Sequence, residues 1–134
     1  MKRITSGKAW EERMRFAPAI RIEPAPLVFT SGLTGRGPDG RIVEGGVGAQ
    51  ARQAFQNISD VLEAAGSSMS GIVKLTYYVA DMTQWEEVAT ARAGFFTGPL
   101  PASATVEVSR FWDETCLVEI EAVAIVNNEN GKPS

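Results

Sequence analysis

Two stretches of the chain place apolar residues at the three- and four-residue spacing of an amphipathic helix. The first extends from about residue 49 to residue 65, and Gly66 follows it as a natural helix end. The second begins near Thr83-Gln84-Trp85-Glu86, which matches a capping box, and Gly98-Pro99-Leu100-Pro101 ends it. The apolar positions expected to face the core are Ala51, Phe55, Ile58, Leu62 and Ala65 in the first helix, and Trp85, Val88, Ala89, Phe95 and Phe96 in and after the second.

Five other stretches have the composition or the alternation of β-strands. Residues 27–30 form a short apolar run, residues 72–79 are rich in β-branched and aromatic side chains, and residues 16–22 give a weaker strand signal. Residues 104–109 and 118–126 alternate between two faces. The order of strands and helices predicts an α+β fold, in which two helices pack on one face of a mixed β-sheet.

A chain of 134 residues is long enough for one domain with a modest core. We expect an N-terminal extension over residues 1–15, a single domain over residues 16–126 and a polar tail over residues 127–134. When both helices lie on one face of the sheet, the other face needs cover, and this predicts association of several copies of the chain.

Charge and the rarer side chains argue against several classes of function. The net charge of −3 argues against a basic surface, so no nucleic-acid partner is expected. The absence of histidine and the single cysteine, Cys116, remove the usual metal ligands, and we predict no metal site and no cofactor. No apolar run approaches the length of a membrane span and residues 1–8 do not resemble a signal peptide, so we expect no membrane partner and a cytoplasmic location. Cys116 itself is predicted to be a catalytically silent small hydrophobe.

Two glycine-rich segments resemble ligand-binding loops. Residues 35–40 read G-x-G-x-x-G, but a dinucleotide-binding loop needs a helix directly after it, whereas Arg41-Ile42-Val43 is typical of extended chain. Pro38-Asp39-Gly40 favours a turn instead. Gly45-Gly46-Val47-Gly48 precedes the first helix and could shape an anion site, although flexible entry into the helix is the favoured interpretation.

A pair of carboxylates interrupts the last apolar strand. Glu119 and Glu121 are two residues apart, so their side chains point to the same face of the sheet. Carboxylates on such a strand need solvent or a partner. Either this face is exposed at a subunit edge, or one of the two residues holds a water molecule or accepts a proton in a cleft. The residues alone leave both interpretations open.

Several segments resemble the RidA/YjgF family of enamine and imine deaminases. The most specific is the C-terminal signature, Pro101-Ala102-Ser103-Ala104-Thr105-Val106-Glu107-Val108 followed by Val118-Glu119-Ile120-Glu121-Ala122-Val123-Ala124. The resemblance runs from about residue 16 to residue 126. The other matching segments are Thr30-Ser31-Gly32, residues 50–58, residues 61–66, residues 72–76, Asp81-Met82 and Phe95-Phe96.

This resemblance implies a chorismate-mutase-like α+β fold, assembled as a homotrimer with small-molecule clefts between neighbouring subunits. In active members of the family, an arginine in the C-terminal signature clamps the carboxylate of the substrate, as its planar fork allows. A glutamate on the last strand positions the attacking water. A serine, an early tyrosine and an asparagine on the second helix complete the pocket.

Matched residue by residue, the chain keeps only part of that set. Glu119 corresponds to the glutamate and Ser31 to the serine, whereas Ser103 occupies the position of the arginine. Ala89 falls at the asparagine, and Ala19 falls at the tyrosine with the spacing to Ser31 one residue short. We expect Thr105 beside these residues in the pocket. Short side chains at three of the positions predict a larger and less cationic pocket.

Another arginine could replace the missing one. Arg110 is the nearest candidate in the sequence, but Ser103 and Arg110 are an odd number of residues apart and face opposite sides of a regular strand. A bulge would reverse this relation. Arg21 and Arg92 are more remote candidates.

The leading hypothesis is a hydrolase or deaminase that acts on an imine, an enamine or a related carbonyl compound bulkier or less acidic than 2-aminoacrylate, using a water held by Glu119. The alternative is a non-catalytic trimer that binds a metabolite or serves as a scaffold. A ribonuclease activity, sometimes attributed to the family, is disfavoured by the acidic balance and the absent histidine.

Overall fold

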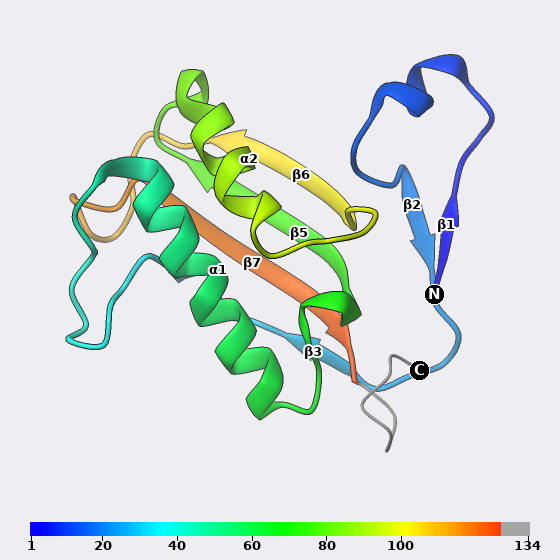
Figure 1. Cartoon of the computed structure of the whole chain (residues 1–134), viewed down its shortest axis with the longest axis horizontal. Helices are drawn as coiled ribbons and strands as arrows, with labels where there is room; N and C mark the ends of the chain where they lie inside the picture. Colours follow the sequence, from blue (N-terminus) through cyan, green and yellow to red (C-terminus); the bar gives the residue numbers. More distant parts are fainter. Residues whose placement is uncertain (127–134) are drawn as a thin grey trace.

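The structure, a computed structural model, describes residues 1–126, so the predicted tail at 127–134 lies outside the described residues. Figure 1 shows a helical layer over a twisted sheet, with a separate hairpin near the N-terminus. The helices are α1 (Gly46–Ala64) and α2 (Trp85–Ala93). The strands are β1 (Lys2–Ile4), β2 (Ala19–Arg21), β3 (Leu27–Phe29), β4 (Leu33–Thr34), β5 (Ile72–Val79), β6 (Ala102–Glu107) and β7 (Val118–Ile125). Short 3-10 turns cover Ala9–Arg13, Met69–Gly71 and Met82–Gln84.

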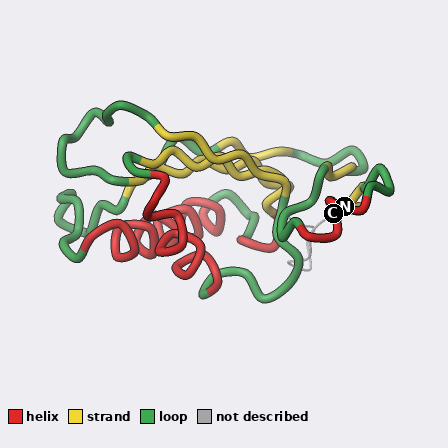
Figure 2. Tube along the Cα trace, turned by 90° about the horizontal axis from the view of Figure 1, so that it is seen from above, coloured by secondary structure: helices red, strands yellow, loops and turns green. Residues whose placement is uncertain are grey.

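The main sheet has five strands, in the order β3-β7-β5-β6, with β4 also paired to β7. Strands β5 and β6 are parallel and the other pairs are antiparallel, so the sheet is mixed. Figure 2 shows α1 and α2 together on one side of it. The predicted α+β class, with two helices on one face of a mixed sheet, is confirmed. Strands β1 and β2 form a sheet of their own.

The core lies between the helices and one face of the sheet. Along β7 the residues Val118, Ile120, Ala122 and Ala124 are buried, and Glu119 and Glu121 occupy the other face. The alternation predicted for this strand is therefore confirmed. The predicted aromatic residues also pack into or against the core, where the ring pairs are Phe55–Tyr77, Phe55–Phe95, Phe55–Phe96 and Tyr77–Trp85.

The predicted helix bounds differ from the structure at three places. Helix α1 begins at Gly46, earlier than expected, because Gly45 takes the left-handed conformation with φ 113° and starts the helix there. Helix α2 ends at Ala93, well before Gly98. The predicted capping box is wrong, because Asp81 caps a preceding 3-10 turn and its carboxylate accepts hydrogen bonds from the Thr83 amide at 2.9 Å and hydroxyl at 2.6 Å.

Two strands were not predicted, and one begins earlier than predicted. Strand β6 starts at Ala102 rather than at residue 104, because the parallel strand β5 offers it hydrogen-bonding partners from Lys74 onward. Strands β1 and β4 are too short to produce an alternation. The pairing of β1 with β2 means that residues 2–4 and 19–21 form one hairpin across the expected boundary at residue 15.

The two glycine-rich segments adopt the local structures that the sequence favours. Gly40 has φ 82°, and the amide of Gly37 donates to the carbonyl of Arg41 at 2.9 Å. Residues 35–40 are therefore a turn, with Arg36 and Ile42 bridged across it, and no helix follows directly. The second segment provides the left-handed entry into α1.

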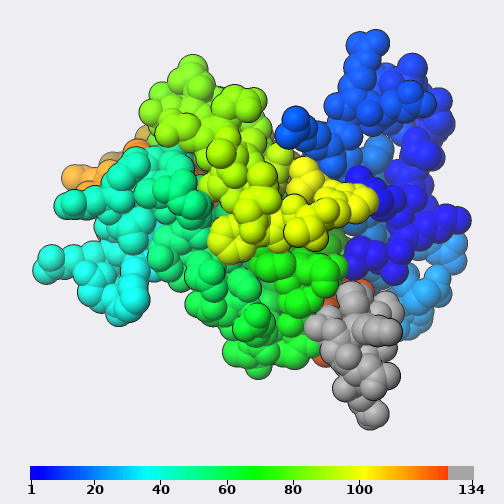
Figure 3. All heavy atoms as spheres, viewed as in Figure 1, coloured from blue at the N-terminus to red at the C-terminus, as the bar shows by residue number. Residues whose placement is uncertain are grey.

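The N-terminal hairpin contacts the segment that leads into β6. Arg3 donates a hydrogen bond to the carbonyl of Leu100, and Phe16 forms a parallel bridge with the same residue. In Figure 3 the N-terminal segment meets this part of the surface directly. Inside the hairpin, Glu11 accepts hydrogen bonds from the hydroxyls of Ser6 and Thr5. These bonds lower the pKa of Glu11 to about 2.

The side chain of Gln50 connects α1 to the segment before β7. It is 3% exposed, its Nε2 donates to the carbonyl of Thr115 at 2.9 Å, and its Oε1 accepts from the amide of Leu117 at 2.7 Å. Two backbone groups next to the last strand therefore depend on one amide side chain. This contact helps to set the position of Glu119.

Gln50→Ala should lower the free energy of unfolding by about 2–3 kcal/mol, because both backbone groups lose their partner. Urea unfolding measures the change. The control is Gln56→Ala on the same helix, where an exposed amide bonds only to Asp60 and a change within about 0.5 kcal/mol is expected. Equal unfolding midpoints for the two variants would contradict this role of Gln50.

Candidate functional site

A small cavity lies around Glu119, on the side of the sheet away from the helices. Glu119 pairs with Thr34 of β4 on one side and with Tyr78 of β5 on the other. The cavity has a volume of about 190 Å³. Its lining residues are Gly32, Thr34, Arg36, Phe111, Trp112, Asp113, Cys116 and Glu119.

Gly32 provides the space that the Glu119 carboxylate occupies. A Cβ atom at this position would lie 2.6 Å from Oε2 of Glu119, closer than real contacts allow. The preceding residues are fixed by Thr30, whose hydroxyl accepts from the amide of Ala122 at 3.0 Å and donates to the carbonyl of Ser31 at 2.8 Å. Ser31 is exposed beside Gly32. The Thr30-Ser31-Gly32 segment thus meets β7 at the glutamate.

The two glutamates of β7 differ in their partners. The hydroxyl of Tyr78 donates to Oε1 of Glu121 at 2.5 Å, and this bond raises the pKa of Tyr78. Within residues 1–126, the carboxylate of Glu119 makes no hydrogen bond and no ion pair. A carboxylate that lines a cavity without a protein partner can bind a water molecule and take its proton.

The opposite wall of this cavity carries charges of both signs. Arg36 lies 3.9 Å from Asp113, a weak and partly exposed ion pair. The hydroxyl and amide of Thr115 donate to Asp113 at 2.6 and 2.8 Å and lower the pKa of that carboxyl. Trp112 is 100% exposed in the single chain. The wall is therefore polar and ends in an aromatic side chain that no residue between 1 and 126 covers.

Ser103 and Thr105 line a second cavity, of about 490 Å³. Ala89 lines a third, of about 300 Å³, which shares Arg15 and Arg92 with the second. Arginines line both spaces in the single chain, whereas the expectation of a less cationic pocket concerns a pocket between subunits and stays a prediction. The residues around Ser103 and Thr105 are Arg13, Met14, Arg15, Phe16, Met82, Trp85, Arg92 and Ala104.

Within one chain, the predicted site residues form two separate groups. Ser103 and Thr105 pair with Leu75 and Tyr77, whose side chains are buried on the helix side of the sheet. Glu119 pairs with Tyr78 and faces the other way. Their cavities share no lining residue. A single pocket that contains both groups therefore needs a second copy of the chain.

Two of the predicted residues lie apart from the cavities described above. Ala19 is exposed on β2, opposite Ile4 of β1. Arg110 is exposed and follows the end of β6 at Glu107, so the strand parity used to place it does not extend that far. Neither residue lines the cavities around Glu119, Ser103 or Ala89.

Two arginines have a clearer place in these cavities than the sequence indicated. Arg92, a remote candidate from sequence, is two helical turns after Trp85 and lies on the same side of α2, 5.6 Å from the centre of the indole ring. That spacing was a usable signal. Arg36, inside the glycine-rich turn, was missed, because a turn residue carries no periodicity.

Cys116 contacts the Glu119 cavity but is buried. Its thiol donates to the carbonyl of Val118 at 3.2 Å, and burial raises its pKa. A raised pKa reduces the fraction of thiolate, the reactive form. This supports the prediction that Cys116 is catalytically silent.

Over the described range, residues 1–126, no cluster of three or more His, Cys, Asp or Glu side chains could hold a metal ion. None of the helices in that same range is long and apolar enough to cross a membrane.

The fold and the Glu119 cavity together define a class of small α+β proteins with a carboxylate on the uncovered sheet face. Comparison with known proteins shows which family has this fold. The profile of the Endoribonuclease L-PSP family matches residues 7–126. The mouse protein named 2-iminobutanoate/2-iminopropanoate deaminase is 34% identical over 92% of this chain and 90% of its own length.

Solved structures show the same similarity. RidA from the Antarctic bacterium Psychrobacter sp. PAMC 21119 superposes with a TM-score of 0.72 and 30% identity, over 82% of this chain and 87% of its own. A YjgF/YER057c/UK114 family member from Mycobacterium tuberculosis has a TM-score of 0.66 and 34% identity, over 93% of this chain and 98% of its own. The chain belongs to the RidA/YjgF family.

Gly32→Ala should displace the Glu119 carboxylate with a change in unfolding free energy of at most about 1 kcal/mol, because only the end of a flexible side chain must move. A crystal structure of the variant and urea unfolding test both parts. Gly94→Ala is the control, since Gly94 has φ −74° and a Cβ atom added there would lie at an ordinary 3.5 Å from the carbonyl oxygen of Ala91. An unmoved Glu119 in the Gly32 variant would contradict the close contact.

Proposed function

We propose that this protein is a homotrimeric hydrolase of imines or enamines, with Glu119 as the residue that holds and deprotonates the attacking water. The water oxygen bonds to the imine carbon, the nitrogen takes up protons, and the carbinolamine then expels ammonia to leave a carbonyl compound. The mouse relative is named for this type of reaction on two small imino acids.

The observation that carries the proposal is the contrast between Glu119 and Glu121. Both carboxylates lie on one face of β7. The carboxylate of Glu121 accepts a hydrogen bond from the hydroxyl of Tyr78. The carboxylate of Glu119 lines a cavity and has no hydrogen-bonding or ion-pairing partner in the described part of the chain. General-base catalysis needs a carboxylate that can reach both water and substrate. Of these two carboxylates, Glu119 is the one that meets that requirement.

The trimer is supported by the surface that the helices leave uncovered. Phe29 is 70% exposed there, Leu27 and Val106 are 41% and 42% exposed, and all three belong to strands of the main sheet. Leu27 and Phe29 lie on β3 at one edge of the sheet and Val106 on β6 at the other edge, so the face carries exposed apolar side chains at both edges, as an interface would. If this face of one copy packed against the β6 edge of the next, as in a closed ring, the Glu119 cavity of one copy would meet the Ser103 cavity of another.

The side chains around Ser103 support a substrate bulkier than 2-aminoacrylate. Ser103 and Ala89 are short, and the cavity beside Ser103 holds about 490 Å³. Space of this size accepts an aromatic or branched side chain. The alternative, a non-catalytic metabolite-binding trimer, would use the same cavities without turnover.

A ribonuclease function is less well supported, although the matching family is named Endoribonuclease L-PSP. The chain has a net charge of −3 and no histidine. A phosphate backbone is bound along an extended basic surface, which a net charge of −3 disfavours, and RNA cleavage usually needs a base that titrates near neutral pH.

Light scattering at micromolar concentration should give a mass of three times 14.4 kDa. Phe29→Lys should shift the protein toward smaller species, because it places a charge in the proposed interface. Trp10→Lys is the matched control, since Trp10 is also exposed but lies in the N-terminal hairpin. A wild-type monomer would rule out the interfacial site.

Glu119→Gln should reduce hydrolysis of the imine of phenylalanine at least about 100-fold, because the amide cannot accept the proton of water. The imine is generated in place by an amino-acid oxidase, and release of the keto acid is followed. Wild-type protein should use 2-aminoacrylate roughly 100-fold less efficiently than an arginine-bearing relative, since Ser103 supplies no clamp at the position where so small a substrate would need it.

Glu121→Gln is the control for this substitution, because it removes a carboxylate from the same face and leaves Glu119 in place. Its activity should remain within a few-fold of the wild type. Wild-type protein that binds the keto acid but hydrolyses no imine would favour the non-catalytic alternative.

A further inference from the structure

The guanidinium of Arg92 is buried without an acidic partner. Arg92 is 7% exposed, and in the chain up to residue 126 no carboxylate lies within ion-pairing distance of it. Its neighbours are the face of Trp85, at 5.6 Å, and the hydroxyl of Tyr77. A buried charge normally has a counter-ion. The missing counter-ion of Arg92 indicates that a ligand supplies it.

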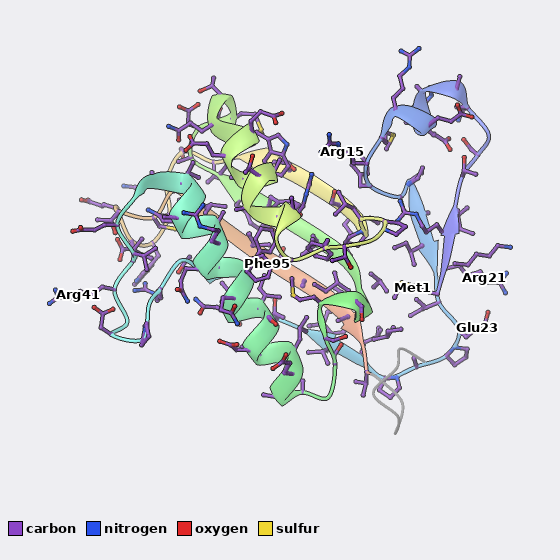
Figure 4. The ribbon with its side chains drawn as sticks, in the orientation of Figure 1. Met1, Arg15, Arg21, Glu23, Arg41 and Phe95 are labelled. Atoms are coloured by element: carbon purple, nitrogen blue, oxygen red, sulfur yellow. The ribbon has the colours of Figure 1, made fainter. Side chains whose placement is uncertain are left out.

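Arg92 lines the two adjoining cavities, beside Ser103 and beside Ala89, and Arg15 lines both of them with it. Figure 4 shows Arg15 on the N-terminal segment, on the side toward α2. Arg13 contributes a third cation to the larger cavity. Neither space has an acidic lining residue. The electrostatic field in this region therefore attracts an anion.

The remaining lining of the larger cavity is mostly apolar. Phe16, Met82 and Trp85 surround the space next to Ser103. A ligand that satisfies both features carries an anionic group on an apolar body. A carboxylate fits, because a guanidinium can bind it through two parallel hydrogen bonds, the stacked indole holds Arg92 in place, and the imino acid of the proposed reaction carries such a group.

We propose that Arg92, with support from Arg15, binds the carboxylate of the substrate and takes over the role of the cation absent at position 103. The substrate is an imino acid with an aromatic or large apolar side chain. The assignment rests on the proposed function for the reacting end of the substrate, whereas binding of the carboxylate does not depend on hydrolysis.

The test uses two unreactive probes, 3-phenylpropanoate and its neutral amide, 3-phenylpropanamide, with binding measured by calorimetry. Wild-type protein should bind the carboxylate at least about tenfold more tightly than the amide. Arg92→Gln should reduce this preference to within about threefold, and Arg92→Lys should retain part of it, since lysine keeps the charge and loses the fork. Arg15→Gln should give an intermediate loss.

Arg41→Gln is the control and should leave the preference unchanged, because Arg41 is exposed in a turn at the end of the molecule opposite to Arg15 (Figure 4). Since Arg92 is buried, near-ultraviolet circular dichroism checks that its variants fold. If the Arg92 variants do not fold, two measurements on the wild-type protein test the proposal instead. They are the comparison of the two probes and a shift of the Arg92 Nε–H resonance in the NMR spectrum when the carboxylate binds. Equal binding of the two probes by wild-type protein, or a full preference in folded Arg92→Gln, would overturn the proposal.

Glu119→Gln separates this proposal from the proposed function. It should bind 3-phenylpropanoate as the wild type does while losing imine hydrolysis. Carboxylate binding through Arg92 without any imine turnover would refute the hydrolase and leave the Arg92 site intact. Imine turnover that is unaffected by Arg92→Gln would refute the Arg92 site and leave the hydrolase intact.

Discussion

The two-residue alternation along β7 determines the positions of both the core and the Glu119 cavity. This strand pairs with β3, β4 and β5, so it holds most of the main sheet together. One set of its side chains fills the core under α1, and the other set includes Glu119 and Glu121. A shift of register by one residue would place both carboxylates in the core. The packing that stabilises the domain therefore also keeps Glu119 at the surface.

Much of this arrangement follows from the sequence, because it depends on periodic patterns. The alternation of β7, the bounds of β5 and the apolar stripe of α1 are all visible in the order of residues. The turn at residues 35–40 also follows from its local composition. The bounds of α2 and β6 do not, since a 3-10 turn capped by Asp81 and a parallel partner strand set them. Both depend on contacts that no single segment encodes.

The candidate sites are less accessible to such reasoning, because their walls come from distant segments. Gly32 matters for the space it leaves to Glu119, and Arg15 matters because the N-terminal segment turns back along α2 and the edge of β6. Neither fact appears in a periodic pattern. The resemblance to the RidA/YjgF family placed Glu119 and Ser103 in one pocket, while one chain presents them on opposite sides of the sheet. Only an assembled oligomer could reconcile the two.

The position of the cation explains how the pocket could be both larger and still suited to a carboxylate. An arginine at position 103 would project from the sheet into the cavity and fill part of it. Arg92 instead lies in the wall, against Trp85, and leaves the space beside Ser103 open. Its rotamer is fixed by packing in the folded protein, so little side-chain entropy remains to be lost on binding. If Arg92 binds the substrate carboxylate as proposed, the short residue at 103 and the buried cation on α2 act together. The anion-binding group then lies in the wall of the cavity, and the space beside Ser103 can hold a bulkier substrate.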